Sequence, residues 1–173
     1  MLNVLGKSGS RRRRVEQLYA TAVARARAPV FFARLGVPDT IDGRFDLLVL
    51  HAWLVLDRLR QGGPQDLSQG FTDAIFIGFD EGLRDLGAGD MGIGRRMKKM
   101  ADAFYGRLQA YGASGDLASM TAAVARNLYR GATNSEHNAE IVARYALAAR
   151  ERLSHADMTT DDIDFGPLPE PQK

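Results

Sequence analysis

The sequence predicts an all-α protein: a compact single-domain bundle of about six to seven helices, followed by an extended acidic C-terminal tail. Apolar residues recur at three- and four-residue intervals along most of the chain, and no segment alternates apolar and polar residues as a half-buried strand would. Glycine and proline divide these segments into pieces of helical length. A chain of 173 residues is suited to one domain with a substantial core.

The first three helices are predicted from their starts, ends and apolar positions. An amphipathic helix is expected over residues 13–28. Pro29 suits the first turn of a short helix that runs to Leu35. The next helix covers residues 43–61. Its apolar run, residues 47–56, is far shorter than the about 20 residues that cross a bilayer, so it is expected to be the buried central helix.

The fourth helix is expected to open at Asp66 or Ser68 and to run to Leu86, with Gly87 in the left-handed position after its end. Gly78 and Gly82 interrupt this helix, and Gly106 interrupts the next one. Glycine costs about 1 kcal/mol relative to alanine inside a helix, so these positions predict close backbone approach. Helix packing is the interpretation we favour, and a groove for a partner is the alternative.

Three more helices complete the predicted bundle, over residues 93–111, over residues 117–128, and from a cap at Asn134 or Ser135 onward. After His155 the chain becomes acidic and contains prolines, which predicts an extended tail with Phe165 packed on the body. The predicted organisation is therefore a flexible basic arm (residues 1–12), a helical domain (residues 13–154) and a tail (residues 155–173).

Charge is distributed in blocks although the net charge is only +2. Residues 91–107 carry five basic and one acidic side chain, and Arg95, Lys98, Lys99 and Asp102 share the solvent side of the predicted helix there. The Arg11 to Arg14 run suits an electrostatic tether to ribosomal RNA or to anionic lipid head groups, and a solvated arm is the alternative.

No catalytic constellation is recognisable. The chain has no cysteine, and His51, His137 and His155 lack the spacing of metal ligands. His51 lies in the apolar helix and is interpreted as a hydrogen-bonded core residue. The glycine-rich residues 87–94 follow a helix and lack the Gly-Lys-Ser/Thr ending of a phosphate loop. We therefore expect no enzyme, no bound cofactor and no metal.

The connection before the central helix carries specific residues. Gly36 suits the left-handed position after the short helix, and Pro38 prevents that helix from continuing. The next helix can be capped by Asp39, Thr40 or Asp42. A positive charge at a helix N-terminus is disfavoured, so Arg44 should be held by an acid or directed at a partner. The acids in reach are Asp39, Asp42 and Asp46.

This connection and four later motifs resemble the ubiquinol-cytochrome c chaperone family. In chain order the matching segments are RAPVFFARLGVPDTIDGRFD (27–46), LRDLGAGD (83–90), RMKKM (96–100), AFYGR (103–107) and RNLY (126–129). The resemblance spans roughly residues 15–150 and implies a non-enzymatic chaperone that binds newly synthesised cytochrome b and supports assembly of the bc complex.

The resemblance implies nascent or newly inserted cytochrome b as the partner. The basic Arg11 to Arg14 run adds the ribosome or an anionic membrane surface as candidate partners, a small helical protein is a further candidate, and no specific DNA is expected. The expected location is the bacterial cytoplasm at the periphery of the inner membrane, or the matrix side in a mitochondrion. The contact surface is expected around Phe31, Phe32, Arg34, Asp39, Arg44, Arg84, Asp90, Lys98, Lys99 and Arg107. These residues could instead serve capping and pairing within the chain.

Two other functions are consistent with parts of the sequence. A ribosome- or nucleic-acid-binding helical module would use Arg11 to Arg14 and the basic segment 95–99, but it lacks interleaved aromatic residues and a recognition-helix motif. A small-molecule enzyme would need a deep polar pocket that encloses His51 with Asp57 or Arg44.

Overall fold

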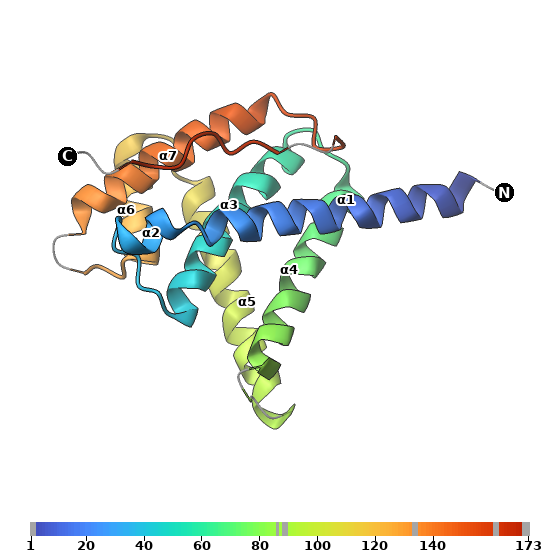
Figure 1. Cartoon of the computed structure of the whole chain (residues 1–173), viewed down its shortest axis with the longest axis horizontal. Helices are drawn as coiled ribbons and strands as arrows, with labels where there is room; N and C mark the ends of the chain where they lie inside the picture. The colour runs from blue at the N-terminus through green and yellow to red at the C-terminus, as the bar shows by residue number, and fades with distance from the viewer. Residues whose placement is uncertain (1–2, 86, 88–89, 133–134, 161–162, 171–173) are drawn as a thin grey trace.

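The computed structural model describes residues 3–85, 87, 90–132, 135–160 and 163–170. Within these ranges the protein is all-α, as the sequence predicts, with seven helices and no strand. In Figure 1, α1 crosses the molecule, and α4 and α5 form a hairpin that extends to one side of it. The helices are α1 (Asn3–Ala26), α2 (Pro29–Ala33), α3 (Ile41–Arg60), α4 (Gln65–Asp85), α5 (Asp90–Gly112), α6 (Leu117–Leu128) and α7 (Glu136–Ser154).

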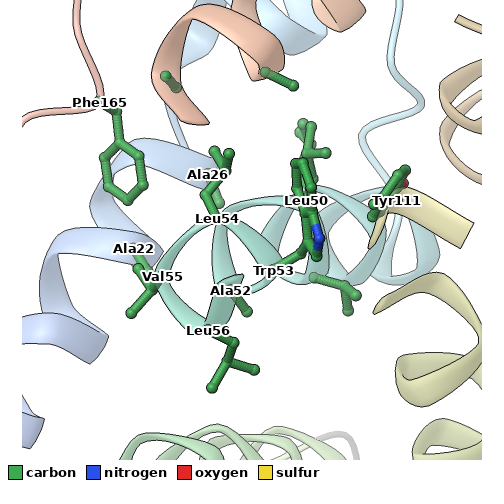
Figure 2. Close-up of a cluster of buried hydrophobic side chains, with 14 of the residues drawn as sticks. Ala22, Ala26, Leu50, Ala52, Trp53, Leu54, Val55, Leu56, Tyr111 and Phe165 are labelled. Carbon is green, nitrogen blue, oxygen red and sulfur yellow. The ribbon is translucent and has the colours of Figure 1, made fainter. Parts of the chain in front are cut away.

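Helix α3 is the central helix, as predicted. Residues 49–56 are all buried, because α1, α4, α5, α6 and α7 all contact α3. The ring of Trp53 lies 5.7 Å from that of Tyr111 on α5, and Phe165 of the C-terminal segment enters the same core, as Figure 2 shows. No helix in the described ranges is long and apolar enough to cross a membrane.

The corner between α2 and α3 has the predicted construction. Gly36 has a φ of +68°, and the Val37 amide donates to the Phe31 carbonyl at 2.9 Å, which satisfies the end of α2. Of the three candidate caps, Thr40 is the one used: its hydroxyl oxygen accepts from the Gly43 amide at 3.1 Å.

The N-terminal boundary differs from the prediction, because α1 begins at Asn3 rather than near residue 13. Two ion pairs involve this part of the helix: Arg12 with Glu16 one turn later, and Arg11 with Asp66 on α4. The sequence signal was weak here because this segment has little apolar periodicity. The basic residues of the expected flexible arm are therefore helical from residue 3 onward.

The last helix also begins differently. Ser135 occupies the N-cap position of α7, but its hydroxyl donates to the Ala132 carbonyl, and no side-chain cap forms. Asn134, the other candidate cap, lies outside the described residues. The tail follows the prediction, since Phe165 is buried and Gly166 accepts a hydrogen bond from Arg25 at 2.8 Å through its carbonyl.

The glycines inside helices have different roles. A Cβ at Gly78 would collide with the hydroxyl of Tyr19 on α1, so close approach is confirmed there. A Cβ at Gly82 or Gly106 would meet nothing within 4 Å. The prediction of close packing is therefore wrong at these two positions, and the space beside Gly82 is open.

Candidate functional site

Among the predicted contact residues in and after α2, some are buried in the core and others are accessible to solvent. Phe31 is fully buried between the rings of His51 and Tyr145, each with its centroid 5.6 Å away. It packs the core and is inaccessible to a partner here. Phe32 is half-buried and Arg34 is exposed, so both remain accessible.

Arg44 is held by an acid of the same corner, which is one of the two alternatives that the sequence predicts. Its guanidinium donates to the Asp39 carboxylate at 2.7 Å, and this hydrogen bond holds the pKa of Asp39 below its ordinary value. Both side chains are exposed, so the pair closes the corner at the surface. Solvent-exposed pairs of this kind contribute little to stability, roughly 0 to 1 kcal/mol.

The other two acids near Arg44 bind different arginines. Asp46 is completely buried and lies 2.7 Å from Arg107 on α5 and 3.3 Å from Arg130 after α6. Arg130 also lies 3.2 Å from Asp42. Burial raises the pKa of the Asp46 carboxyl, and the two arginines oppose the shift. Arg107, a predicted partner-binding residue, is thus engaged within the fold, with its guanidinium over the Phe45 ring at 5.2 Å.

His51 is buried and hydrogen-bonded, as predicted. Its Nδ1 lies 2.8 Å from the Leu47 carbonyl, which can only accept, so Nδ1 carries the proton and Nε2 accepts from the Tyr145 hydroxyl at 2.9 Å. Burial lowers the pKa of His51 to about 4. The imidazole is neutral at pH 7 and is fully used by its two partners, so it acts as a core residue.

The basic side chains in the first half of α5 are exposed at the surface. Arg95, Lys98 and Lys99, here called the α5 ridge, are exposed, and none of them forms an ion pair with another residue that the structure describes. Arg96 lies on the flank of the ridge and is exposed as well. Asp102 is exposed on the same helix one turn after Lys98, so the ridge with this acid presents a net positive charge on the hairpin, suited to an anionic partner.

The remaining predicted residues are less free. Arg84 donates to Asp80 one turn before it at 2.7 Å, on the exposed face of α4. The side chain of Asp90 lies outside the described residues. In the Arg11 to Arg14 run, Arg14 is buried and donates to the Met158 carbonyl, which ties α1 to the C-terminal segment. This use within the chain weakens the case for an RNA-binding arm.

Helices α1, α3, α4 and α5 together form an apolar groove, which the sequence indicated only through the alternative interpretation of the helix glycines. It has a volume of about 340 Å³, and its lining includes Ile41, Phe45, Leu83 and Met100. Gly82 also lines the groove, on the side where a Cβ would meet nothing. The groove is formed by four helices that are distant in sequence, so Gly82 was the one local indication of it in the sequence.

The described part of the chain contains no group of three or more histidine, cysteine, aspartate or glutamate residues that could hold a metal ion. The candidate enzyme pocket is not formed, because Leu47 and Tyr145 satisfy His51, and Asp57 is bound by Arg150 at 2.8 Å. The described residues therefore form an all-α domain whose α5 ridge and apolar groove are accessible to a partner.

The chain belongs to the ubiquinol-cytochrome c chaperone family, whose sequence profile matches residues 33–161. This confirms the resemblance read from the motifs. The family's members are assembly chaperones of the bc complex and not enzymes. The matched region begins in α2 and includes the corner, the hairpin and α7.

Characterised relatives agree with this assignment. The chain is 23% identical to ubiquinol-cytochrome-c reductase complex assembly factor 1 of Xenopus laevis over 162 residues, which cover 89% of this chain and 81% of that protein. The relatives of the same name in mouse and human are 22% and 23% identical, and the match spans 55% and 54% of their lengths. The crystal structure of the Cbp3 homolog from Brucella abortus superposes with a TM-score of 0.86 at 36% identity, covering 96% of this chain and 97% of that one.

Proposed function

We propose that this protein binds newly synthesised cytochrome b and keeps it competent for incorporation into the bc complex. The observation that carries the proposal is the family match over residues 33–161, three quarters of the chain. A helical domain with unpaired surface charges and an open apolar groove is suited to binding the exposed polar and apolar surfaces of an incompletely assembled protein. The proposed function is a binding function, and it requires no cofactor bound to the chaperone.

The client would meet the protein at the inner membrane, in the bacterial cytoplasm or on the matrix side of a mitochondrion. The α5 ridge is suited to this location, since each basic residue close to an anionic membrane surface contributes about 1 kcal/mol of attraction. The same ridge could contact acidic side chains of the client. Among the expected contact residues, Lys98, Lys99, Arg34 and Phe32 have the accessibility that either contact needs.

The test is capture of cytochrome b by the full-length tagged protein. Cytochrome b would be synthesised in a cell-free system with membranes and radiolabelled, and the chaperone would be recovered under mild detergent. Recovery of cytochrome b, but not of an equally apolar membrane protein made in parallel, supports the proposal. Equal recovery of both, or of neither, contradicts it.

Charge reversal identifies the contact surface. Lys98→Glu with Lys99→Glu should abolish capture and leave helicity and melting nearly unchanged, because neither lysine is paired with a described residue. The matched control is Arg60→Glu with Arg126→Glu, which changes the net charge equally at exposed bases on α3 and α6. Loss of capture in the control alone, or loss of fold in the ridge variant, would exclude the ridge as the docking surface.

A further inference from the structure

The α5 ridge lies on a part of the molecule that projects from the body. The α4–α5 hairpin extends away from the other helices (Figure 1), and the ridge occupies the first half of α5. With Arg96 on its flank, four exposed bases lie between residues 95 and 99. The exposed acid of this face is Asp102, one turn after Lys98. Four bases against one acid leave a net charge of +3 on this face of the helix.

The acids of α4 face other parts of the molecule and do not cancel this charge. Asp80 is paired within its own helix. Asp85 lines the apolar groove beside α1 and α3, and the carboxylate of Glu81 acts electrostatically on the hydroxyl of Tyr19 on α1. Helix α5 instead packs on the side of α4 that carries Phe76, whose ring lies 5.3 Å from an α5 ring. The α5 ridge therefore keeps its positive charge.

The other basic segment, Arg11 to Arg14, is less available to an anionic partner. Arg11 is paired with Asp66 on α4, and Arg12 is paired with Glu16 one turn later. Arg14 is buried. The bases of the ridge form no ion pair with a residue that the structure describes. The structure thus favours the ridge, and not the N-terminal segment, as the electrostatic tether that the sequence predicts.

The composition of the ridge favours a lipid surface over nucleic acid or a folded protein. Residues 92–100 contain no aromatic residue. Sites for single-stranded nucleic acid combine a basic groove with aromatic side chains on which bases stack. Protein interfaces depend on a few aromatic, apolar or arginine anchors in well-packed pockets. Attraction between several basic side chains and anionic lipid head groups requires neither feature.

We propose that the α5 ridge binds the anionic phospholipid surface of the membrane that receives the client. The inference rests on the proposed function, because a chaperone for newly made cytochrome b works where that protein enters the bilayer. The contact is reversible, since each basic residue raises the partition onto an anionic surface only about fivefold. Docking through the ridge turns the hairpin toward the membrane.

The test is co-sedimentation of the full-length protein with vesicles in the absence of client. Vesicles of phosphatidylcholine are compared with vesicles that also contain the anionic lipid phosphatidylglycerol. We expect binding to the anionic vesicles alone, and loss of that binding at high salt, which screens exposed charges. Lys98→Ala with Lys99→Ala should lower the partition coefficient roughly 25-fold, about fivefold for each base.

Two control variants remove the same charge elsewhere. Arg60→Ala with Arg126→Ala removes two exposed bases from α3 and α6. Arg12→Ala with Arg13→Ala removes two exposed bases from the N-terminal part of α1. Both should leave vesicle binding nearly unchanged, and circular dichroism would first establish that all variants are folded.

A fluorescent label gives a second readout in the protein with its ridge intact. The chain has no cysteine, so a single introduced cysteine can be labelled selectively. Gly92 lies one turn before Arg96, and a Cβ there would meet nothing within 4 Å. An environment-sensitive fluorophore on Gly92→Cys should shift its emission to the blue when anionic vesicles are added. Gly115→Cys, between α5 and α6, has equally open surroundings and should show no shift.

Several results would overturn the lipid inference. These are no binding to anionic vesicles, equal binding by the ridge variant, or loss of binding in the Arg12 and Arg13 variant alone. An emission shift at position 115 and not at position 92 would also contradict it. Binding of an RNA homopolymer that depends on the ridge, without binding to vesicles, would make the ridge a nucleic-acid site.

The vesicle assay and the capture assay separate this inference from the proposed function. Capture of cytochrome b without vesicle binding leaves the chaperone function standing and refutes the lipid contact. Vesicle binding without capture refutes the chaperone function. Because cytochrome b is synthesised with membranes in the capture assay, loss of docking would lower capture there as well, and the vesicle assay isolates this cause because it contains no client.

Discussion

Replacing Arg107 by alanine separates two roles for this residue, contact with a partner and neutralisation of a buried acid. Arg107 is only 16% exposed, and its guanidinium lies 2.7 Å from the completely buried carboxylate of Asp46. Arg107 also donates to the Ala103 carbonyl one turn earlier at 3.1 Å. Without Arg107, only the half-exposed Arg130 would remain beside the buried charge, at 3.3 Å.

The expected cost of Arg107→Ala is about 3 kcal/mol, the lower end of the 3–5 kcal/mol found when one partner of a buried ion pair is removed, because Arg130 still contributes. For a domain of this size that corresponds to a fall in melting temperature of roughly 6–12 °C. The cost should shrink as the pH falls. Burial already raises the pKa of Asp46, and loss of Arg107 raises it further, so protonation increasingly removes the unpaired charge as the pH falls.

The assay is urea unfolding followed by circular dichroism at pH 7 and at pH 5. Two variants serve as controls. Asp46→Asn with Arg107→Met removes both charges and should be more stable than Arg107→Ala alone. Arg144→Ala breaks an exposed pair with Glu140 and should cost only about 0.3–0.5 kcal/mol. If Arg107→Ala lowers the free energy of unfolding no more than Arg144→Ala does, and yet abolishes capture of cytochrome b, then Arg107 is a partner-binding residue and the structural reasoning is wrong.

Three further predictions concern the core, the glycines and the tail. Because the folded state holds the pKa of His51 at about 4 and the unfolded state near 6.5, only the unfolded chain gains this proton as the pH falls between them. Stability should drop by about 3 kcal/mol over that interval, and in His51→Leu the drop should be absent from urea titrations. Gly82→Ala should raise the free energy of unfolding by about 0.5–1 kcal/mol, whereas Gly78→Ala should lower it by about 1 kcal/mol because a tyrosine ring must move. Phe165→Ala should cost about 3–5 kcal/mol, against less than about 1 kcal/mol for Leu168→Ala, whose side chain is 40% exposed.

Each of these has a contradicting result. A wild-type pH dependence that survives in His51→Leu would mean that other groups carry it. Equal effects of alanine at Gly78 and Gly82 would contradict the difference in their surroundings. Equal melting of the Phe165→Ala and Leu168→Ala variants would show that the tail is not part of the core.

Local features were predictable from the sequence because their causes are local. Gly36 ends a helix in the left-handed conformation, Thr40 caps the next one, and Arg44 binds an acid five residues away. His51 was placed in the core because a histidine inside an apolar helix is buried only with hydrogen-bond partners.

Contacts between distant segments were not predictable in the same way. The pairing of Asp46 with Arg107 and Arg130 joins the start of α3 to α5 and to the end of α6, and no spacing rule connects those positions. The groove has the same origin, since four helices form it. The early start of α1 was missed because residues 3–12 have little apolar periodicity, and the ion pair of Arg11 with Asp66 joins segments that are distant in sequence.

The measurement that tests the central claim most directly is the reduced-minus-oxidised haem b spectrum of membranes from a source strain that lacks this gene, with and without the gene restored. The chaperone function predicts loss of the bc-complex haem b signal, recovery of that signal when the gene returns, and intact signals from the terminal oxidases. A bc-complex signal that is unchanged in the deletion strain would contradict a required role in cytochrome b assembly.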